Sequence, residues 1–132
     1  MLLSFYLEEK FRIQIQKNGF AQYDEHIVIP VTKNPYPITI TLAPGYSVSG
    51  TVTNETTGSP IANARVHCVI GSNAYGDIVI ETSTNNLGQY TLPNVPGGTR
   101  TLKAAANDTL VTYMGESLTR SVPVSSAVNF TL

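Results

Sequence analysis

The chain has 132 residues, a length that suits one domain with part of another. Apolar residues make up 42% of it, enough for a core, which argues against a globally disordered protein. The net charge is −1 without runs of like charge, which argues against nucleic-acid binding, because phosphates require clustered Lys and Arg. With only 13% charged residues, Ser, Thr, Asn and Gln must cover much of the surface, as on many extracellular β-proteins.

Within the first 45 residues, 11–15 and 38–42 alternate between apolar and polar side chains with a period of two, which predicts strands. Residues 1–7 are apolar but have no basic residue before them, so we expect neither a signal peptide nor a membrane span. Prolines 30, 35 and 37 suit edges and turns, because proline cannot donate to a ladder. The strands expected in this region are 2–7, 10–17, 20–31 (broken once) and 36–43.

Two of these segments resemble segments near the C-terminus. Residues 38–42 resemble 127–132 at a spacing of 90, and residues 10–15 resemble 99–104 at a spacing of 89. The two similar spacings predict that residues 1–43 are the second half of a preceding copy of the same domain. Because three or four strands with one apolar face are marginally stable alone, we expect this half-repeat to pack on the complete domain or to self-associate with another copy of the chain.

From residue 46 onward the pattern predicts a complete β-sandwich over 46–132. Thr and Val dominate the alternating runs, and the turn signals Pro44-Gly45, Gly58-Ser59-Pro60 and Pro96-Gly97-Gly98 separate them. Seven strands are the usual complement of a compact sandwich, so the predicted fold class is all-β, a seven-stranded antiparallel Greek-key sandwich preceded by a partial β-repeat. The expected strands are 46–53, 63–71, 76–84, 88–93, 99–106, 110–122 (broken near Gly115) and 126–132.

Few residues carry chemistry that an active site needs. Cys68 is the only cysteine and alternates with Ala64 and Val66, which predicts a buried, inert thiol. His67 then points to the opposite face of the same strand, so a Cys–His pair is not expected. His26 lies in the other half of the chain, and neither histidine has ligand partners at metal spacing. We therefore expect no catalytic, cofactor-binding or metal-binding residues.

An ordered set of motifs extends along the second region. It comprises Val48-x-Gly50-x-Val52, Pro60-Ile61-x-Asn63-Ala64-x-Val66, Thr84-Asn85-x-x-Gly88-x-Tyr90-x-Leu92, Val95-Pro96-x-Gly98 and Phe130-Thr131-Leu132. This set resembles the carboxypeptidase regulatory-like domains, which share a transthyretin-like (prealbumin-like) sandwich. The resemblance covers about 85 residues.

Each motif has a physical reason, and three positions depart from the family. Gly50 allows close approach of a neighbouring chain, Gly88 admits a positive φ, and the Asn85 side chain can hydrogen-bond its loop. Asn85 stands where the family commonly has Asp, which weakens a calcium-type interpretation of that loop. Arg100 stands where an aromatic residue is usual, and Asn107-Asp108 replaces a Gly-aromatic turn.

The resemblance implies a non-catalytic structural or spacer module of a larger secreted or cell-surface protein, with neighbouring domains as its partners. The short linker 43–45 would limit the hinge between units. Two alternatives remain open. Tyr75 and Tyr113, together with Tyr46, fall near strand ends, where exposed rings could stack on a glycan, although tyrosines half buried at the rims of a sandwich explain them as well. The module could instead dock a peptidase or transporter through a protein contact.

Overall fold

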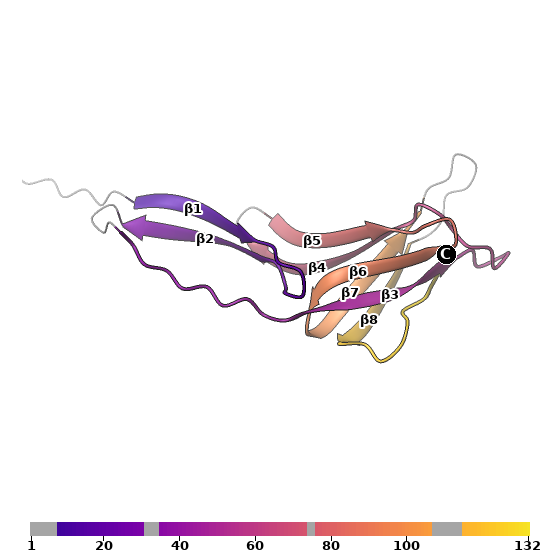
Figure 1. Ribbon diagram of the computed structural model, residues 1–132. Coiled ribbons are helices and arrows are strands. Elements are labelled where there is room, and N and C mark those ends of the chain that lie inside the picture. The colour runs from indigo at the N-terminus through magenta and orange to yellow at the C-terminus, as the bar shows by residue number, and fades with distance from the viewer. Residues whose placement is uncertain (1–7, 31–34, 74–75, 107–114) are drawn as a thin grey trace, which may run out of the picture.

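The computed structural model describes residues 8–30, 35–73, 76–106 and 115–132, and these residues contain strands and no helix. A two-stranded hairpin projects from a two-layered sandwich, and the extended segment 35–44 leads from the hairpin to the sandwich (Figure 1). The strands are β1 (Glu8–Ile15), β2 (Tyr23–Pro30), β3 (Gly45–Thr53), β4 (Arg65–Asn73), β5 (Gly76–Ser83), β6 (Gln89–Pro96), β7 (Gly98–Ala105), β8 (Glu116–Val122) and β9 (Phe130–Thr131).

The sandwich is formed by strands β3 to β9. One sheet has the strand order β6-β3-β9 and the other β5-β4-β7-β8, so the chain crosses between layers after β3, β5, β6 and β8. The ladders described within the sandwich are antiparallel except that between β3 and β9, which is parallel. The predicted all-β sandwich is confirmed.

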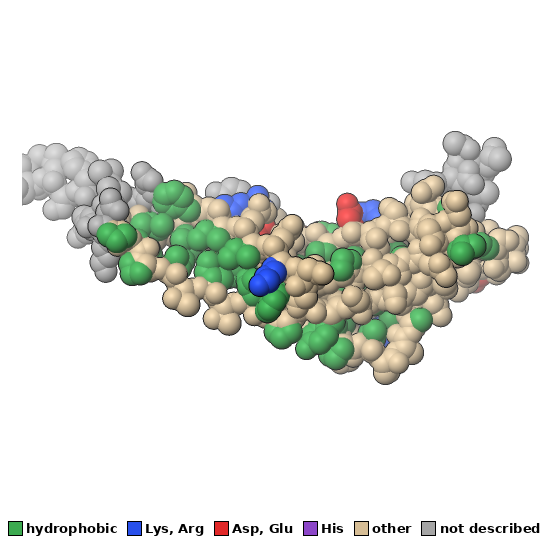
Figure 2. Space-filling model, in the orientation of Figure 1, with side chains coloured by type: hydrophobic (Ala, Val, Ile, Leu, Met, Phe, Trp, Pro, Cys, Tyr) green, Lys and Arg blue, Asp and Glu red, His purple; other side chains and the backbone are tan. Residues whose placement is uncertain are grey.

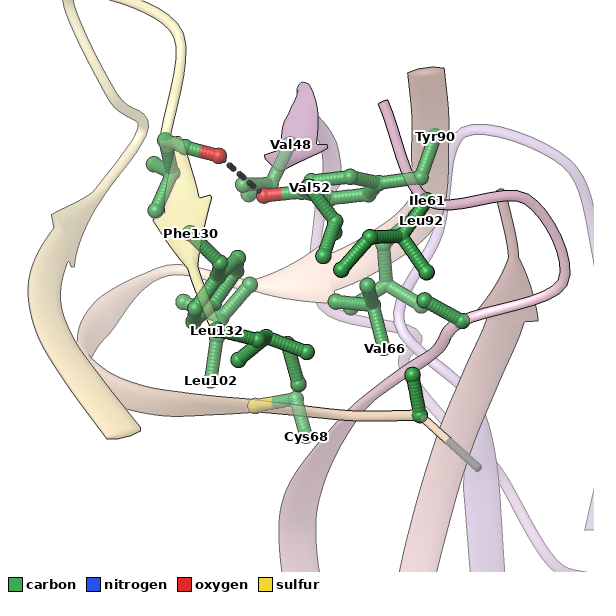
Figure 3. Close-up of a cluster of buried hydrophobic side chains, with 14 of the residues drawn as sticks. Val48, Val52, Ile61, Val66, Cys68, Tyr90, Leu92, Leu102, Phe130 and Leu132 are labelled. Atoms are coloured by element: carbon green, nitrogen blue, oxygen red, sulfur yellow. Dashed lines mark hydrogen bonds between the residues drawn. The ribbon is translucent and has the colours of Figure 1, made fainter. Parts of the chain in front are cut away.

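Alternate residues of both sheets build the core. Their side chains interdigitate between the layers in Figure 3. Burying one such aliphatic side chain contributes roughly 1.5–3 kcal/mol, so this set is the main source of stability. The fully buried residues include Val48, Val52, Val66, Cys68, Leu92, Leu102, Val128 and Phe130. The predicted burial of Cys68 is confirmed, and the burial raises the pKa of its thiol, which keeps it protonated and unreactive.

The chain just before β9 lies against β3 at Gly50. A Cβ atom added there would lie 1.8 Å from the carbonyl oxygen of Val128, so a larger residue has no room. The hydroxyl of Tyr90 donates to the same carbonyl at 2.6 Å, as the dashed line in Figure 3 marks. Burial raises the pKa of Tyr90 to about 12, so the hydroxyl remains a donor at neutral pH.

The loop between β5 and β6 is held by its own side chains, as the sequence predicted. The Oδ1 atom of Asn85 accepts hydrogen bonds from the backbone N–H groups of Leu87 at 2.9 Å and Gln89 at 3.0 Å. Gly88 has a φ of +70°, and a Cβ atom there would lie 2.6 Å from the Val52 carbonyl oxygen. A glycine is therefore required both for the turn and for packing.

The hairpin β1–β2 has one polar and one apolar face. On the polar face Asp24 accepts from Arg12 Nε at 2.9 Å and Nη2 at 2.6 Å, and from Gln14 Nε2 at 3.2 Å. The Arg12 guanidinium lowers the pKa of Asp24 from its usual 3.8 to about 2, so the carboxylate is ionised at neutral pH. The opposite face carries the alternate residues Phe11, Ile13, Ile15, Tyr23, Ile27 and Ile29, with Glu25 among them.

One predicted strand was wrong, and so were several predicted strand boundaries. Residues 36–43 are extended but join no ladder among the described residues, because no strand lies beside them to accept their hydrogen bonds. The last strand is confined to residues 130–131 rather than 126–132, because the chain before it meets β3 at only a few points. The second strand begins at Tyr23, since residues 16–22 form the hairpin turn. Residues 2–7 and 110–114 lie outside the described residues.

Candidate functional site

The turn of the hairpin is fastened to the linker that leads into the sandwich. The Ala21 N–H donates to the Ala43 carbonyl at 2.8 Å, and the Gly45 N–H donates to the Gly19 carbonyl at 3.0 Å. Phe20 and Pro44 form an isolated antiparallel bridge between these two bonds. The linker therefore has backbone partners on the hairpin and is not a free hinge.

A third contact attaches the hairpin turn to β6. The side-chain oxygen of Asn94 accepts from the Gly19 N–H at 2.9 Å. Asn94 has a φ of +61°, a left-handed conformation that asparagine tolerates better than most residues. Its unusual backbone turns the amide toward the hairpin.

Gly45 makes this close approach feasible. A Cβ atom at Gly45 would lie 2.7 Å from the carbonyl carbon of Phe20, 2.8 Å from Cα of Asn94 and 2.9 Å from the nitrogen of Ala21. All three neighbours are backbone atoms, which cannot swing aside as a side chain can. We define the joint as residues 19–21, 43–45 and Asn94.

A cavity of about 370 Å³ lies beside the joint, between the hairpin turn and strands β5 and β6. Lys17 and Phe20 line it from the hairpin, and the Lys17 ammonium lies 5.5 Å from the centre of the Phe20 ring. Glu81 lines the side of β5 but forms an ion pair with Arg65. The cavity contains one cation and an already paired carboxylate, an arrangement that suits a polar contact between two units more than a reaction.

A second hollow, of about 410 Å³, lies on the outer face of the four-stranded sheet and is lined by His67, Thr101 and Lys103 among others. Burial, with the charges of Arg65 and Lys103, lowers the pKa of His67, so the ring is neutral at pH 7. His67 lies on the face opposite Cys68, as predicted, so the two do not form a nucleophile and base.

The sequence-predicted ligand residues are not brought together. Tyr75 and Tyr113 lie outside the described residues. Tyr46 is half buried and packs against the core of the sandwich, so its ring is not a freely exposed platform. Across the described ranges, no cluster of three or more His, Cys, Asp or Glu side chains could hold a metal ion.

Sequence reasoning missed two residues. Asn94 carries the contact to the hairpin, and an Asn within an alternating strand gave no signal of its left-handed backbone. Arg100, noted only as a departure from the family, donates from Nε to the Pro96 carbonyl at 3.2 Å and from Nη2 to the Gly97 carbonyl at 3.0 Å. It thereby closes the turn between β6 and β7, a local structural role.

Comparison with known protein families identifies the sandwich. The family model of the carboxypeptidase regulatory-like domain matches residues 47–132, which include nearly all of the sandwich. Searches of curated proteins and of solved structures returned no match. The residues described in the structure form no helix with the length and hydropathy that a bilayer crossing requires. The chain therefore belongs to the carboxypeptidase regulatory-like domain family.

Proposed function

We propose that this chain is a non-catalytic structural module that holds neighbouring β-units at a fixed angle within a larger secreted or cell-surface protein. Membership of the carboxypeptidase regulatory-like family supports the absence of catalysis. The low share of charged residues, 13%, supports an extracellular location, since Ser, Thr and Asn cover the surface instead.

The joint is the observation that carries the proposal. Three hydrogen bonds connect residues 19–21 to the linker and to Asn94, at 2.8, 3.0 and 2.9 Å. A free three-residue linker would let two units swing, whereas each hydrogen bond here opposes that motion by about 0.5–1.5 kcal/mol. A hinge restricted in this way transmits orientation from one unit to the next, which is what a spacer requires.

Distance measurements between spin labels test this proposal. Labels at Lys10→Cys on β1 and Ser121→Cys on β8 report the angle between the hairpin and the sandwich. Both positions are exposed and accept a label. Cys68 is buried and can stay in place without competing for label. We expect one narrow distance distribution in the parent protein.

Two substitutions of Asn94 test whether its hydrogen bond to Gly19 keeps the distance distribution narrow. Asn94→Gly keeps a left-handed backbone but removes the acceptor for Gly19, so the distribution should broaden. Asn94→Asp keeps an oxygen acceptor and should leave it narrow. A broad distribution in the parent protein itself would contradict the proposal.

A further inference from the structure

The hairpins β1–β2 and β7–β8 are both continuous antiparallel ladders, so the shift of 89 between residues 10–15 and 99–104 fixes the shift that applies to β2. When β1 is shifted by 89 residues and β2 by 93, seven pairs of the first hairpin fall on the seven pairs of the second. Ile13 opposite Glu25, for example, falls on Leu102 opposite Leu118. The second hairpin therefore differs by four extra residues in its turn and keeps the same ladder.

The sequence after each hairpin continues the correspondence. The shift of 93 that the ladder requires places Ile29-Pro30 on Val122-Pro123. A shift of 90 then places residues 38–42 on 128–132, the segment that includes β9. Hairpin, proline and final alternating segment follow in the same order in both halves of the chain.

The corresponding face of β7–β8 is covered by the second layer, whereas that of β1–β2 is not, and Phe11 and Ile27 stand where β7–β8 has Arg100 and Arg120. Ile13 is half buried and Phe11 is 42% exposed, whereas Leu102, the counterpart of Ile13, is fully buried. Figure 2 shows hydrophobic side chains gathered over the hairpin and the extended segment beside it. A row of exposed apolar side chains of this kind marks a surface that another element covers.

The extended segment shows the same contrast. Ile38 is 47% exposed, whereas its counterpart Val128 is 2% exposed. Val128 is buried because β3 and β6 lie beside it: its carbonyl fits against Gly50 and accepts from Tyr90. No strand takes that place beside residues 38–42 among the residues described.

We propose that the apolar face of β1–β2, together with residues 36–43, is half of a second sandwich, and that the strands equivalent to β3 to β6 of a preceding copy of this domain complete it. The strand equivalent to β3 runs parallel to residues 38–42, as β3 does to β9. It presents a glycine to the Ile38 carbonyl, and the strand equivalent to β6 supplies a tyrosine hydroxyl to the same oxygen. The inference extends the proposed function by naming the neighbour, but it depends on the hairpin face and not on a stiff joint.

The test supplies the missing strands. A chain of residues 45–98 followed by residues 10–132 lets the turn Gly97-Gly98 lead into β1 as it leads into β7. Amide hydrogen exchange is compared with that of the 132-residue chain. We expect the amides of residues 38–42 to exchange at least ten-fold more slowly in the extended chain, because a parallel strand now binds them.

Matched variants in the extended chain locate the contact. Ile13→Asp places a charge on the apolar face and should abolish the added protection, whereas Lys10→Asp, on the polar face of the same strand, should not. Unchanged exchange at residues 38–42, with the amides of β3 and β4 still protected, would overturn the proposal.

Sedimentation of the unextended 132-residue chain gives an independent answer. We expect a monomer, because a second copy of this chain has its β3 and β6 already engaged in its own core. A dimer that Ile13→Asp dissociates would identify a second copy as the occupant and would overturn the proposal. Neither readout depends on the angle at the joint, so failure here and failure of the spacer function can be told apart.

Discussion

Two hairpins in this molecule share a register and differ in what covers them. β7–β8 lies under β3 and β6, and its inward residues Leu102 and Ala104 are buried. β1–β2 has the same pairing but leaves Phe11, on its apolar face, 42% exposed. The register of a hairpin is set by its own alternation and turn, whereas burial depends on a second layer that local sequence does not supply.

The largest expected loss of stability is at Gly50 of β3, where this strand contacts the chain just before β9. Gly50→Ala places a Cβ atom 1.8 Å from the Val128 carbonyl oxygen, so β3 and the final segment must separate. We expect a loss of roughly 3 kcal/mol or more in the free energy of unfolding, at the upper end of overpacking costs. Denaturant unfolding measures it.

Gly71→Ala is the matched control, because its Cβ atom would lie 3.7 Å from Ile78 Cδ1, an ordinary contact. It should change stability by less than about 1 kcal/mol. Equal losses in the two variants would mean that the close approach at Gly50 does not hold the sheet together.

The next largest effect compares two equivalent positions directly. Leu102→Ala removes a fully buried side chain and should cost about 2–5 kcal/mol. Ile13→Ala changes a half-buried side chain at the corresponding position of β1 and should cost less than about 1 kcal/mol. Chemical denaturation of both variants tests the pair. Similar losses would show that the hairpin face is covered as well as the sandwich core.

The smallest effect is a pH dependence confined to the first hairpin. Since Arg12 lowers the pKa of Asp24 from 3.8 to about 2, folding favours the carboxylate, and its stabilisation is present above about pH 4. It is lost as the pH falls toward 2, so the amides of β1–β2 should exchange faster there, after correction for intrinsic rates. The Thr101–Thr119 hydroxyl contact in β7–β8 has no such titration.

Asp24→Asn should remove most of this pH dependence while leaving the exchange of β7–β8 unchanged. If protection in β1–β2 stays constant between pH 5 and 2 in the parent chain, the ion pair does not stabilise the hairpin.

Much of the sandwich could be predicted from the alternation of residues. The burial of Ala64, Val66 and Leu92 follows from a period of two, and the side-chain bonds of Asn85 follow from turn chemistry. The extended segment 36–43 has the same alternation and was predicted as a strand, yet it joins no ladder among the described residues. Alternation shows that a segment suits a sheet, but a strand also needs a neighbour at hydrogen-bonding distance.

The joint could not be predicted in the same way. Gly45 and Asn94 are far apart in sequence, and their contact with residues 19–21 exists only once the hairpin and sandwich are both formed. Pro44-Gly45 predicted a turn, and this was wrong, because Pro44 forms a bridge with Phe20 and Gly45 begins β3.

By itself the sequence determined which side of each strand is apolar and where the chain reverses, because both depend on residues within a few positions of one another. Tertiary structure alone decided that β9 pairs in parallel with β3, that the hairpin turn attaches to Asn94, and that one hairpin is buried while its counterpart is not. These features depend on contacts between segments tens of residues apart, and no local pattern encodes which segments meet.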